Sequence, residues 1–387
     1  MIQDNSRIGL YSTKTIAGES ISAYIPPKLP PFPPIQFDLQ LLEKASAALG
    51  RLDGIRFILP DTTLFLYMYV TKEALLSSQI EGTQSSLSEL LLFNADPTQK
   101  LPLDDIQEVS SYITAINYGI NRLKTLPISL RMMREIHKKL MSNTRGSTKT
   151  PGEFRTSQNW IGGTRPGTAA FVPPPPGHLS KLLGDLEDFM HDAETHLPTL
   201  IKISLIHAQF ETIHPFLDGN GRLGRLLITL LLCAQNLLAE PYLYLSLYLK
   251  TNRKQYYHHL QAIRETGDWE SWISFFLTGI VETAEQALQT AQTIKALFEE
   301  HQKKIETSPA YTHAMSVVYD HIKQHPITTP KQMTLQCKLS LPTVIKIASK
   351  FEKLGILTET TGKKRHRVFA YTDYLNILSI GTEPLPR

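Results

Sequence analysis

The 387-residue chain is poor in cysteine, and its two cysteines, Cys233 and Cys337, lie far apart. A disulfide framework and a cysteine-rich metal site are therefore excluded, which favours a reducing compartment. No stretch reaches the roughly 18 apolar residues that a membrane span requires. The first residues, MIQDNSRIGLYS, lack a basic segment followed by an apolar one. We therefore expect a cytoplasmic protein.

An excess of charge of one sign is also absent. Lys and Arg number 40 and Asp and Glu number 36, for a formal net charge of +4, which is too small to indicate nucleic-acid binding by the whole chain. Hydrophobic residues make up 42% and charged residues 20%, as in folded globular proteins. The length allows two or three domains.

What the chain does have is a dense polar motif at residues 214–225, HPFLDGNGRLGR. An apolar helical pattern precedes it at 199–213, and a run of Leu, Ile and Ala typical of a buried helix follows at 226–234. The motif is therefore predicted to be a loop that opens the second helix. Its glycines let the backbone approach a ligand closely, and the N-terminus of a helix favours an anion. Such a geometry suits a nucleotide phosphate.

The pattern resembles the signature of the Fic family, HxFxDGNGRxxR, at every fixed position. So many fixed residues are far more specific than a lone GxGxxG. The alternative is a helix–loop–helix corner with a core histidine and surface arginines, but this leaves the register of Asp218, Asn220 and Arg225 unexplained. Fic proteins typically transfer the AMP part of ATP to a hydroxyl side chain of a target protein. The resemblance thus implies a nucleotidyltransferase that uses ATP and Mg²⁺.

Each motif residue has an expected role. A target hydroxyl is a poor nucleophile near pH 7, and His214 can accept its proton as the catalytic base. Asp218 offers a hard oxygen ligand for Mg²⁺. Guanidinium groups match phosphate oxygens, and the family pattern assigns the γ-phosphate to Arg225. Tyr257 is the expected adenine-facing tyrosine, with Tyr256 the alternative. The resemblance implies nucleotide contacts from Gly219, Asn220, Gly221, Arg222, Leu223, Gly224, Arg225, Tyr257, Ile161, Gly162, Gly163 and Glu81.

Residues 154–176 are predicted to form a small hairpin. Two short extended runs flank a GGTRPG turn, and four prolines then prevent further pairing. The segment resembles the flap of Fic proteins, which implies that it holds the target protein by adding a strand. Ile161, Gly162 and Gly163 fall where the family's flap passes over the nucleotide. An ordinary surface hairpin is the alternative.

Residues 77–82, SSQIEG, match the inhibitory motif of Fic proteins, (Ser/Thr)xxxGlu(Gly/Asn). Glu81 ends a predicted helix before a Gly82 cap, where its negative charge interacts unfavourably with the helix dipole. Without a partner, this placement destabilises the helix by roughly 0.3–1 kcal/mol. An arginine partner would compensate, and the family implies Arg225. Ser77 lies on the same helix face and is expected to orient the carboxylate. We expect intramolecular inhibition, with a frayed surface glutamate as the alternative.

The fold class is expected to be mainly α: a Fic-type helical bundle with a small β-hairpin flap, plus a C-terminal winged helix-turn-helix domain. Six prolines at 24–35 predict an extended arm draped over the body, rather than a ligand for a proline-binding module. We divide the chain into an N-terminal arm and helical region with the inhibitory motif (1–125), a Fic catalytic core (126–305) and a winged-helix-like domain (306–387). Helices of the body are expected at about 37–50, 62–81, 104–124, 129–142, 251–265, 269–279 and 280–305.

The last domain combines helical runs at about 312–324, 330–337 and 341–354 with the basic segment TTGKKRHRVFAYT. The predicted recognition helix, LPTVIKIASKFEKLG, is mostly apolar and offers few groups that read bases. The sequence leaves open whether this domain binds DNA or another protein. Its expected phosphate contacts are Lys346, Lys350, Lys363, Lys364, Arg365, His366 and Arg367.

Two functions compete. The first is a protein adenylyltransferase that modifies a Ser, Thr or Tyr of a target protein and also itself, and that is inhibited by Glu81. The second is a DNA-binding regulator that uses the Fic body as a nucleotide sensor. An intact His214, Asp218 and Arg225 favour the enzyme. Another nucleotide or a phosphocholine donor is an alternative substrate, but the GNGRxxR anion site favours a triphosphate. A homodimer and the reverse reaction, removal of AMP, stay open.

Overall fold

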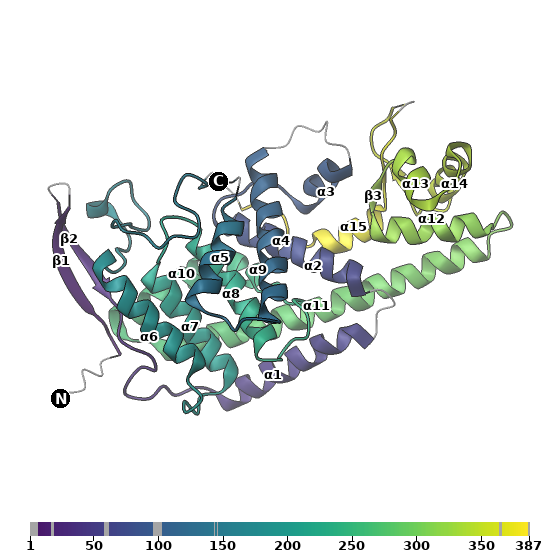
Figure 1. Cartoon of the computed structure of the whole chain (residues 1–387). Coiled ribbons are helices and arrows are strands. Elements are labelled where there is room, and N and C mark those ends of the chain that lie inside the picture. Colours follow the sequence, from purple (N-terminus) through teal and green to yellow (C-terminus); the bar gives the residue numbers. More distant parts are fainter. Residues whose placement is uncertain are drawn as a thin grey trace.

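The computed structural model describes residues 7–16, 19–57, 62–95, 103–142, 144, 146–363 and 366–385. Most of these residues are helical, which confirms the expected fold class, and two small antiparallel sheets lie at opposite ends of the molecule (Figure 1). A 38-residue helix, α11 (Trp269–Glu306), runs from the main body to the C-terminal unit. Within the described part, no helix is long and apolar enough to cross a membrane.

Two buried helices form the centre of the main body. They are α7 (Thr199–Ile213) and α8 (Asn220–Ala234), and nearly all their residues are buried. A helix that is apolar on almost every face lies inside a protein. The motif loop connects them, as predicted, and is therefore rooted in the core.

The other helices of the main body surround this pair. Helices α4 and α5 pack on each other and on α8, α6 packs on α7, and α1 lies along α11 (Figure 1). The expected helices are present, and α3, α6 and α9 are additional to them. The bounds are α1 (Leu39–Asp53), α2 (Thr62–Ile80), α3 (Leu87–Ala95), α4 (Leu103–Leu123), α5 (Leu130–Leu140), α6 (Leu179–His191), α9 (Ser246–Thr251) and α10 (Arg253–Thr266), with 3₁₀ turns at Gly54–Phe57, Pro166–Thr168 and Pro176–His178.

Helix α11 continues through position 279, where the sequence analysis divides it into helices at 269–279 and 280–305. That division is wrong, and the packing of Gly279 explains why. A Cβ atom on Gly279 would lie 2.6 Å from Cδ1 of Tyr248 in α9. The glycine permits close contact between the two helices and does not end either of them.

An unexpected hairpin precedes the proline-rich arm. Its antiparallel strands are β1 (Leu10–Ile16) and β2 (Glu19–Ile25). β2 buries Ile21 beside Val172, and the Tyr24 amide donates to Val172 O at 3.0 Å. The expectation of a single hairpin in the main body is therefore wrong. These two short strands are stabilised by the flap, a contact between distant segments that local periodicity does not reveal.

The proline-rich arm lies against the main body, as predicted. Residues 26–35 form neither helix nor strand. Gln209 Nε2 donates to Pro27 O at 2.8 Å, and Arg7 Nε donates to Pro33 O at 3.1 Å. The arm thus binds its own chain along much of its length.

The C-terminal unit contains the three expected helices and a small three-stranded sheet. Its small sheet has the order β3-β5-β4, and both pairings are antiparallel. A capping box between Thr329 and Gln332 starts α13. The assignment to the winged helix-turn-helix class stays a prediction. The bounds are α12 (His313–Gln324), β3 (Ile327–Thr328), α13 (Pro330–Cys337), α14 (Leu341–Lys353), β4 (Thr358–Glu359), β5 (Phe369–Ala370) and α15 (Thr372–Ser379).

Helix α15 was not expected, and it ties the C-terminal unit to the main body. It packs against α3 and α11. Near its start, the hydroxyl of Tyr371 lies 2.8 Å from Nδ1 of His301, and Tyr319 donates to Phe298 O at 3.0 Å. The last turns of α11 therefore belong to the packed C-terminal unit, and a domain boundary at 306 stays a prediction.

Candidate active site

A cavity of about 480 Å³ opens where the motif loop meets the end of α2, the flap and α10. It gathers most of the side chains that the sequence analysis assigns to the site. Gly163, Leu223 and Gly224 do not line it, although the resemblance assigns them to the nucleotide. The expected residues that line it are Glu81, Ile161, Gly162, His214, Asp218, Gly219, Asn220, Gly221, Arg222, Arg225 and Tyr257.

His214 ends helix α7 in the left-handed region, with φ of 49°. Its amide donates to Phe210 O at 2.9 Å and closes the helix. Nδ1 lies 3.3 Å from Glu211 O, so a proton on Nδ1 leaves Nε2 as the basic atom. Burial lowers the pKa of His214 to about 4. The imidazole is therefore neutral at pH 7 and able to accept a proton.

Arg155, which the sequence analysis does not single out, fixes the backbone of the motif loop. Its Nε donates to His214 O at 2.9 Å, and its Nη2 donates to Pro174 O at 2.6 Å. The side chain of Asn220 closes the loop internally, with 2.8 Å hydrogen bonds to both the N–H and the carbonyl of Phe216. These hydrogen bonds hold the loop in one conformation. Because the side chain of Asn220 is engaged, its contribution to a phosphate site is its backbone N–H.

His137 of α5 supports the loop from the opposite side. Its ring stacks on Phe216, with centroids 3.8 Å apart and planes 9° apart. The Gly152 amide donates to Nδ1 at 2.9 Å, so Nε2 carries the proton and donates to Asp218 O at 2.9 Å. Burial lowers the pKa of His137 to about 4 and keeps the ring neutral. Phe216 is fully buried and anchors the loop.

The start of α8 offers free amides to the cavity. The first N–H groups of a helix have no partner within it, and they carry its positive dipole end. A Cβ on Gly219, whose φ is +76°, would lie 2.5 Å from Met141 Sδ, and one on Gly221 would lie 2.4 Å from Glu81 Oε1. Both positions therefore favour glycine, Gly219 through its positive φ and Gly221 through the closeness of Glu81, and both face the cavity. This arrangement favours a bound anion.

Arg222 reinforces that anion site. Its side chain is only 6% exposed, and Nη2 lies 3.6 Å from Asp218 Oδ1. Nε and Nη1 have no hydrogen-bond partner among the described residues. Because a buried guanidinium with unpaired N–H groups is costly, a phosphate beside it would be strongly favoured. Asp218 itself is 44% exposed, and its Oδ1 accepts from the Gly219 amide at 2.6 Å.

Arg225 is held by the inhibitory motif. Nη2 donates to Glu81 Oε1 at 2.7 Å and to Ser77 O at 3.0 Å, and Nε donates to Ser77 Oγ at 2.9 Å. Burial alone would raise the pKa of Glu81, but the attraction of Arg225 lowers it below its usual value. Gly82 follows with φ of +110°, as expected for a cap. Ser77 was expected to orient the carboxylate, but it binds the arginine instead.

Glu211 is a buried carboxyl that the sequence analysis does not assign. Its Oε2 lies 4.0 Å from Nδ1 of His214, and its Oε1 has no hydrogen-bond partner within the described residues. Burial raises its pKa from 4.5 to about 7. Gly224 lies against it, since a Cβ there would be 2.2 Å from Oε1. Gly224 thus serves the contact between α7 and α8, and Leu223 is buried in the core.

Replacing Glu211 with glutamine is expected to stabilise the chain above neutral pH. Because the folded-state pKa is raised, the stability linked to Glu211 is complete below about pH 4.5 and is lost as the pH rises through about 7. Glutamine cannot ionise. The free energy of unfolding of Glu211→Gln relative to the parent should therefore rise by about 2 kcal/mol between pH 5 and pH 8. Urea titrations at both pH values measure this difference, and two parallel stability curves would contradict the expectation.

The two adjacent tyrosines of α10 have different environments. Tyr256 is 1% exposed, and its hydroxyl lies 2.9 Å from Nε2 of the buried His207. Tyr257 is 39% exposed and packs against the Tyr256 ring. Both line the cavity, but only Tyr257 keeps a substantial accessible surface. The geometry therefore favours Tyr257 as the ring that a ligand contacts.

The flap is less regular than the predicted hairpin. Only one bridge, between Ile161 and Phe171, joins its two arms among the described residues. Gly163 lies in the turn with φ of +72°, where a Cβ would be 2.3 Å from Thr168 O. Glu19 of β2 accepts from the Gly167 amide at 2.9 Å. The N-terminal hairpin thus supports the flap from behind.

Several residues that line the cavity were not predicted. Trp160 is 39% exposed and directly precedes Ile161, which was assigned to the nucleotide. An aromatic residue at that place in the flap was the one feature of the sequence that could have indicated it. Gly146 approaches Asp218 so closely that a Cβ would lie 2.6 Å from Oδ2. No local pattern marks Gly146, because the contact joins distant segments. Glu108 also lines the cavity and accepts from Thr83 Oγ1 at 2.8 Å.

Comparison with known proteins places this site in a family context. The profile described as "Fic/DOC family" matches residues 127–232, and "Fic/DOC family N-terminal" matches residues 39–121. The chain is 31% identical over 201 residues to "Protein adenylyltransferase Fic" of Aedes aegypti, a match that covers 51% of this chain and 37% of that protein. It is 30% identical over 175 residues to the protein of the same name from Drosophila grimshawi, covering 45% of this chain and 33% of that protein. The chain therefore spans about a third of the length of the curated relatives it matches.

A solved structure shares the fold. It is a Fic family protein from Desulfovibrio desulfuricans G20, with a TM-score of 0.55 and 19% sequence identity. The match covers 88% of this chain and 98% of that chain, so the shared architecture extends beyond residues 127–232.

Proposed function

Because the chain belongs to the Fic/DOC family, we propose that it is a protein adenylyltransferase, which transfers AMP from ATP to a hydroxyl side chain of a target protein and of itself. The proposal rests above all on one observation: the neutral His214 faces the same cavity as the glycine-rich start of α8 and the buried Arg222. The guanidinium of Arg222 has N–H groups without an acceptor among the described residues. A base beside an anion site is the minimum that phosphoryl chemistry on a hydroxyl requires.

In the proposed reaction the target oxygen attacks the α-phosphorus of ATP. A new O–P bond forms as the bond to pyrophosphate breaks, and His214 takes the hydroxyl proton on Nε2. Arg222 and the amides of residues 220 and 221 stabilise the charge on the phosphates, and pyrophosphate leaves with the bonding electron pair. Tyr257 packs against the base of the nucleotide.

Asp218 is the residue that would hold Mg²⁺. Mg²⁺ is commonly bound by one or two carboxylates together with phosphate oxygens, and a half-exposed carboxylate next to an anion site fits that requirement. No cluster of three or more His, Cys, Asp or Glu suited to a metal occurs among the described residues, so the phosphates would complete the coordination. When bound, the metal neutralises charge on the phosphates.

We further propose that Glu81 inhibits the enzyme within the same chain. Arg225, the residue assigned to the γ-phosphate, already donates to Glu81 and to the hydroxyl and carbonyl of Ser77. An arginine engaged in this way is unavailable to a nucleotide, so ATP would bind in a non-productive pose. The target protein would meet the flap and add a strand beside the arm that carries the Ile161 bridge.

The direct test compares ATP labelled in the α-phosphate with ATP labelled in the γ-phosphate, each incubated with the purified chain and Mg²⁺. We expect the protein to become labelled from the α position alone, because the γ-phosphate leaves in pyrophosphate. Labelling from the γ position would indicate a kinase. Absence of labelling from either, in the parent chain and in Glu81→Gly, would refute the proposal.

The alternative, a DNA-binding regulator, is weakened by the contacts of the basic residues. Lys350 Nζ donates to Ala310 O at 2.9 Å, and Arg367 pairs with Glu352 at 3.1 Å. Lys364 and Arg365 lie outside the described residues. Exposed apolar side chains lie on α13 and α14 instead: Leu335 is 74%, Leu341 47% and Ile345 45% exposed. These side chains suit a protein partner better than DNA.

Any binding of duplex DNA is accordingly expected to depend only weakly on salt. Lys346, Lys363 and His366 are the exposed basic groups among the described candidates. About three phosphate contacts correspond to a slope of log K against log salt of about −3. Lys346→Ala should make the slope shallower by about one, whereas Lys181→Ala, an exposed lysine of α6, should not. A slope steeper than about −5 would favour the DNA-binding regulator.

A further inference from the structure

The helix that carries the inhibitory motif is also bound by the end of the chain. From the last residue of α15 onward, residues 379–383 contact α2 and α9; we call this segment the C-terminal clasp. Lys72 Nζ of α2 donates to Ile380 O at 2.8 Å, and Gln79 Nε2 donates to Thr382 O at 2.8 Å. Lys250 of α9 donates to the carbonyls of Gly381 and Glu383. The clasp is thus bound through its main chain.

The clasp is a built contact and not a loose tail. Thr382 is 1% exposed, and its amide donates to Ser379 O at 2.9 Å within a tight turn. Gly381 adopts φ of +78°, and a Cβ there would lie 2.6 Å from Leu247 Cδ1, so only glycine fits without displacement. Nearby, Ser88 of α3 and Ser379 pair through their hydroxyls at 3.0 Å.

Lys72 and Lys250 depend on the clasp for the carbonyl groups that accept from their ammonium groups. Lys72 is 3% and Lys250 6% exposed, and burial lowers the pKa of each to about 8, with Glu383 opposing the shift. Lys72 also lies over the Tyr244 ring, 4.7 Å from its centroid. A buried ammonium group that loses its acceptors is strongly disfavoured. Removing the clasp should therefore loosen the segment of α2 that carries Lys72.

Gln79 connects the clasp to the inhibitory motif. It lies two residues before Glu81, and its Nε2 donates both to Thr382 O and, at 2.9 Å, to Ser85 O. Ser85 in turn donates to Asp105 of α4, through its amide at 3.1 Å and its hydroxyl at 2.9 Å. The turn that presents Glu81 to Arg225 is therefore fixed between α4 on one side and the clasp on the other.

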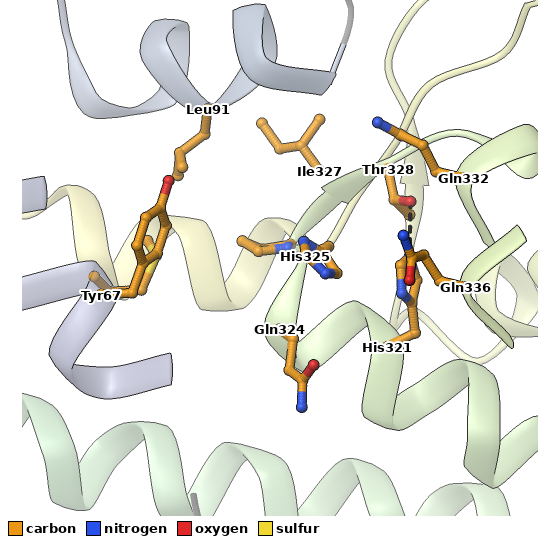
Figure 2. A pocket seen from close by; sticks show the side chains of 11 residues that line it. Tyr67, Leu91, His321, Gln324, His325, Ile327, Thr328, Gln332 and Gln336 are labelled. Carbon is orange, nitrogen blue, oxygen red and sulfur yellow. Dashed lines mark hydrogen bonds between the residues drawn. The ribbon is translucent and has the colours of Figure 1, made fainter. Parts of the chain in front are cut away.

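Away from the clasp, the junction between the C-terminal unit and the main body is incompletely packed. A cavity of about 150 Å³ separates Tyr67 of α2 and Leu91 of α3 from His325 and Gln332 of the C-terminal unit (Figure 2). Polar side chains such as Gln324 and Gln336 line it together with apolar ones such as Leu91 and Ile327. This unfilled part of the junction should give way more readily than its packed parts, such as the contact of α15 with α3. A partner that shifts the C-terminal unit would thus act on the clasp.

We propose that the C-terminal clasp is a second restraint on the inhibitory motif, which holds Glu81 on Arg225 and releases it when the C-terminal unit moves. This inference rests on the proposed adenylyltransferase function. It assigns the C-terminal unit a role in regulation that requires no direct contact with the active site.

The test removes the clasp in the presence and absence of the glutamate. Truncation after Ser379 and the milder Gln79→Ala are each made in the parent and in Glu81→Gly, and self-labelling from α-labelled ATP is measured. In the parent, both changes should raise labelling about fivefold, the equivalent of ~1 kcal/mol of lost restraint. In Glu81→Gly neither should change it, because the inhibitory contact is already gone. Ser88→Ala, which removes a clasp contact to α3 but none to α2, should match the parent.

Hydrogen exchange provides a readout that needs no catalysis. The amides of residues 78–83 should exchange faster in the truncated chain than in the parent, with ATP absent from both. Unchanged exchange, or equal effects of truncation with and without Glu81, would overturn the proposal while leaving the adenylyltransferase function intact. If no variant is labelled, the proposed function fails, and the exchange data still decide whether the clasp restrains α2.

Discussion

His214→Ala is expected to lower AMP transfer by about a thousandfold while leaving ATP affinity nearly unchanged. General-base catalysis contributes on the order of 10²–10⁴ in rate, and the partly exposed, neutral imidazole is the group placed to accept the proton of the target hydroxyl. Phosphate binding relies on the start of α8 and on Arg222, neither of which the substitution touches. The Glu81→Gly background gives the measurement its widest range.

Two comparisons make that result specific. His258→Ala removes an exposed histidine of α10 next to Tyr257 and should label like its parent. Nucleotide titration by calorimetry should give dissociation constants for His214→Ala and its parent within about twofold, since a lost phosphate contact would cost more. A His214→Ala chain that transfers AMP at the parental rate would show that another group is the base. Loss of both binding and transfer would point to collapse of the motif loop.

The motif loop could be predicted from sequence because its determinants are local. His214, Asp218 and the two glycines lie within one turn between two helices, so spacing alone places them on one cavity. Arg155 and His137 were missed for the opposite reason. Each reaches the loop from a distant segment and binds backbone carbonyls, which leave no trace in residue identity.

Helix ends and strands illustrate the same difference. The first residues of α13 and α14 follow from the side chains of Thr329 and Ser340, which cap the N-termini of these helices. The continuity of α11 through Gly279 could not be predicted, because a glycine that permits close packing and a glycine that ends a helix look alike in sequence. The β1–β2 hairpin and the clasp depend on partners more than a hundred residues away, such as Val172 and Lys72. Tertiary contacts of this kind decide structure where local preference is weak.

The pairing of Glu81 with Arg225 was implied by the family resemblance, but the part played by Ser77 was not. The hydroxyl and carbonyl of Ser77 both accept from Arg225, so the arginine keeps two hydrogen bonds when the Glu81 carboxylate turns toward solvent. This arrangement divides the restraint between a charged contact and neutral ones. Removing Glu81 alone should therefore free the N–H that it accepts for a phosphate, while Ser77 keeps the guanidinium paired.

Glu81→Gly is expected to raise self-labelling by an order of magnitude or more, about what 1.4 kcal/mol of lost competition for Arg225 would give. The guanidinium is then available to the γ-phosphate, and ATP can adopt a productive pose. Glu81→Gln, which keeps the size of the side chain but removes its charge, should give a smaller rise. Labelling rates at saturating ATP, in chains with matched melting temperatures, measure both effects.

Arg225→Ala separates this mechanism from a general loosening of the site. The single substitution should lower labelling, because the γ-phosphate loses its arginine. Adding Glu81→Gly to it should restore little, since the two residues act through one contact of 2.7 Å and their effects cannot add. Suppose instead that Glu81→Gly activates Arg225→Ala as strongly as it activates the parent. Glu81 would then act by blocking the cavity itself, and the arginine would be a bystander.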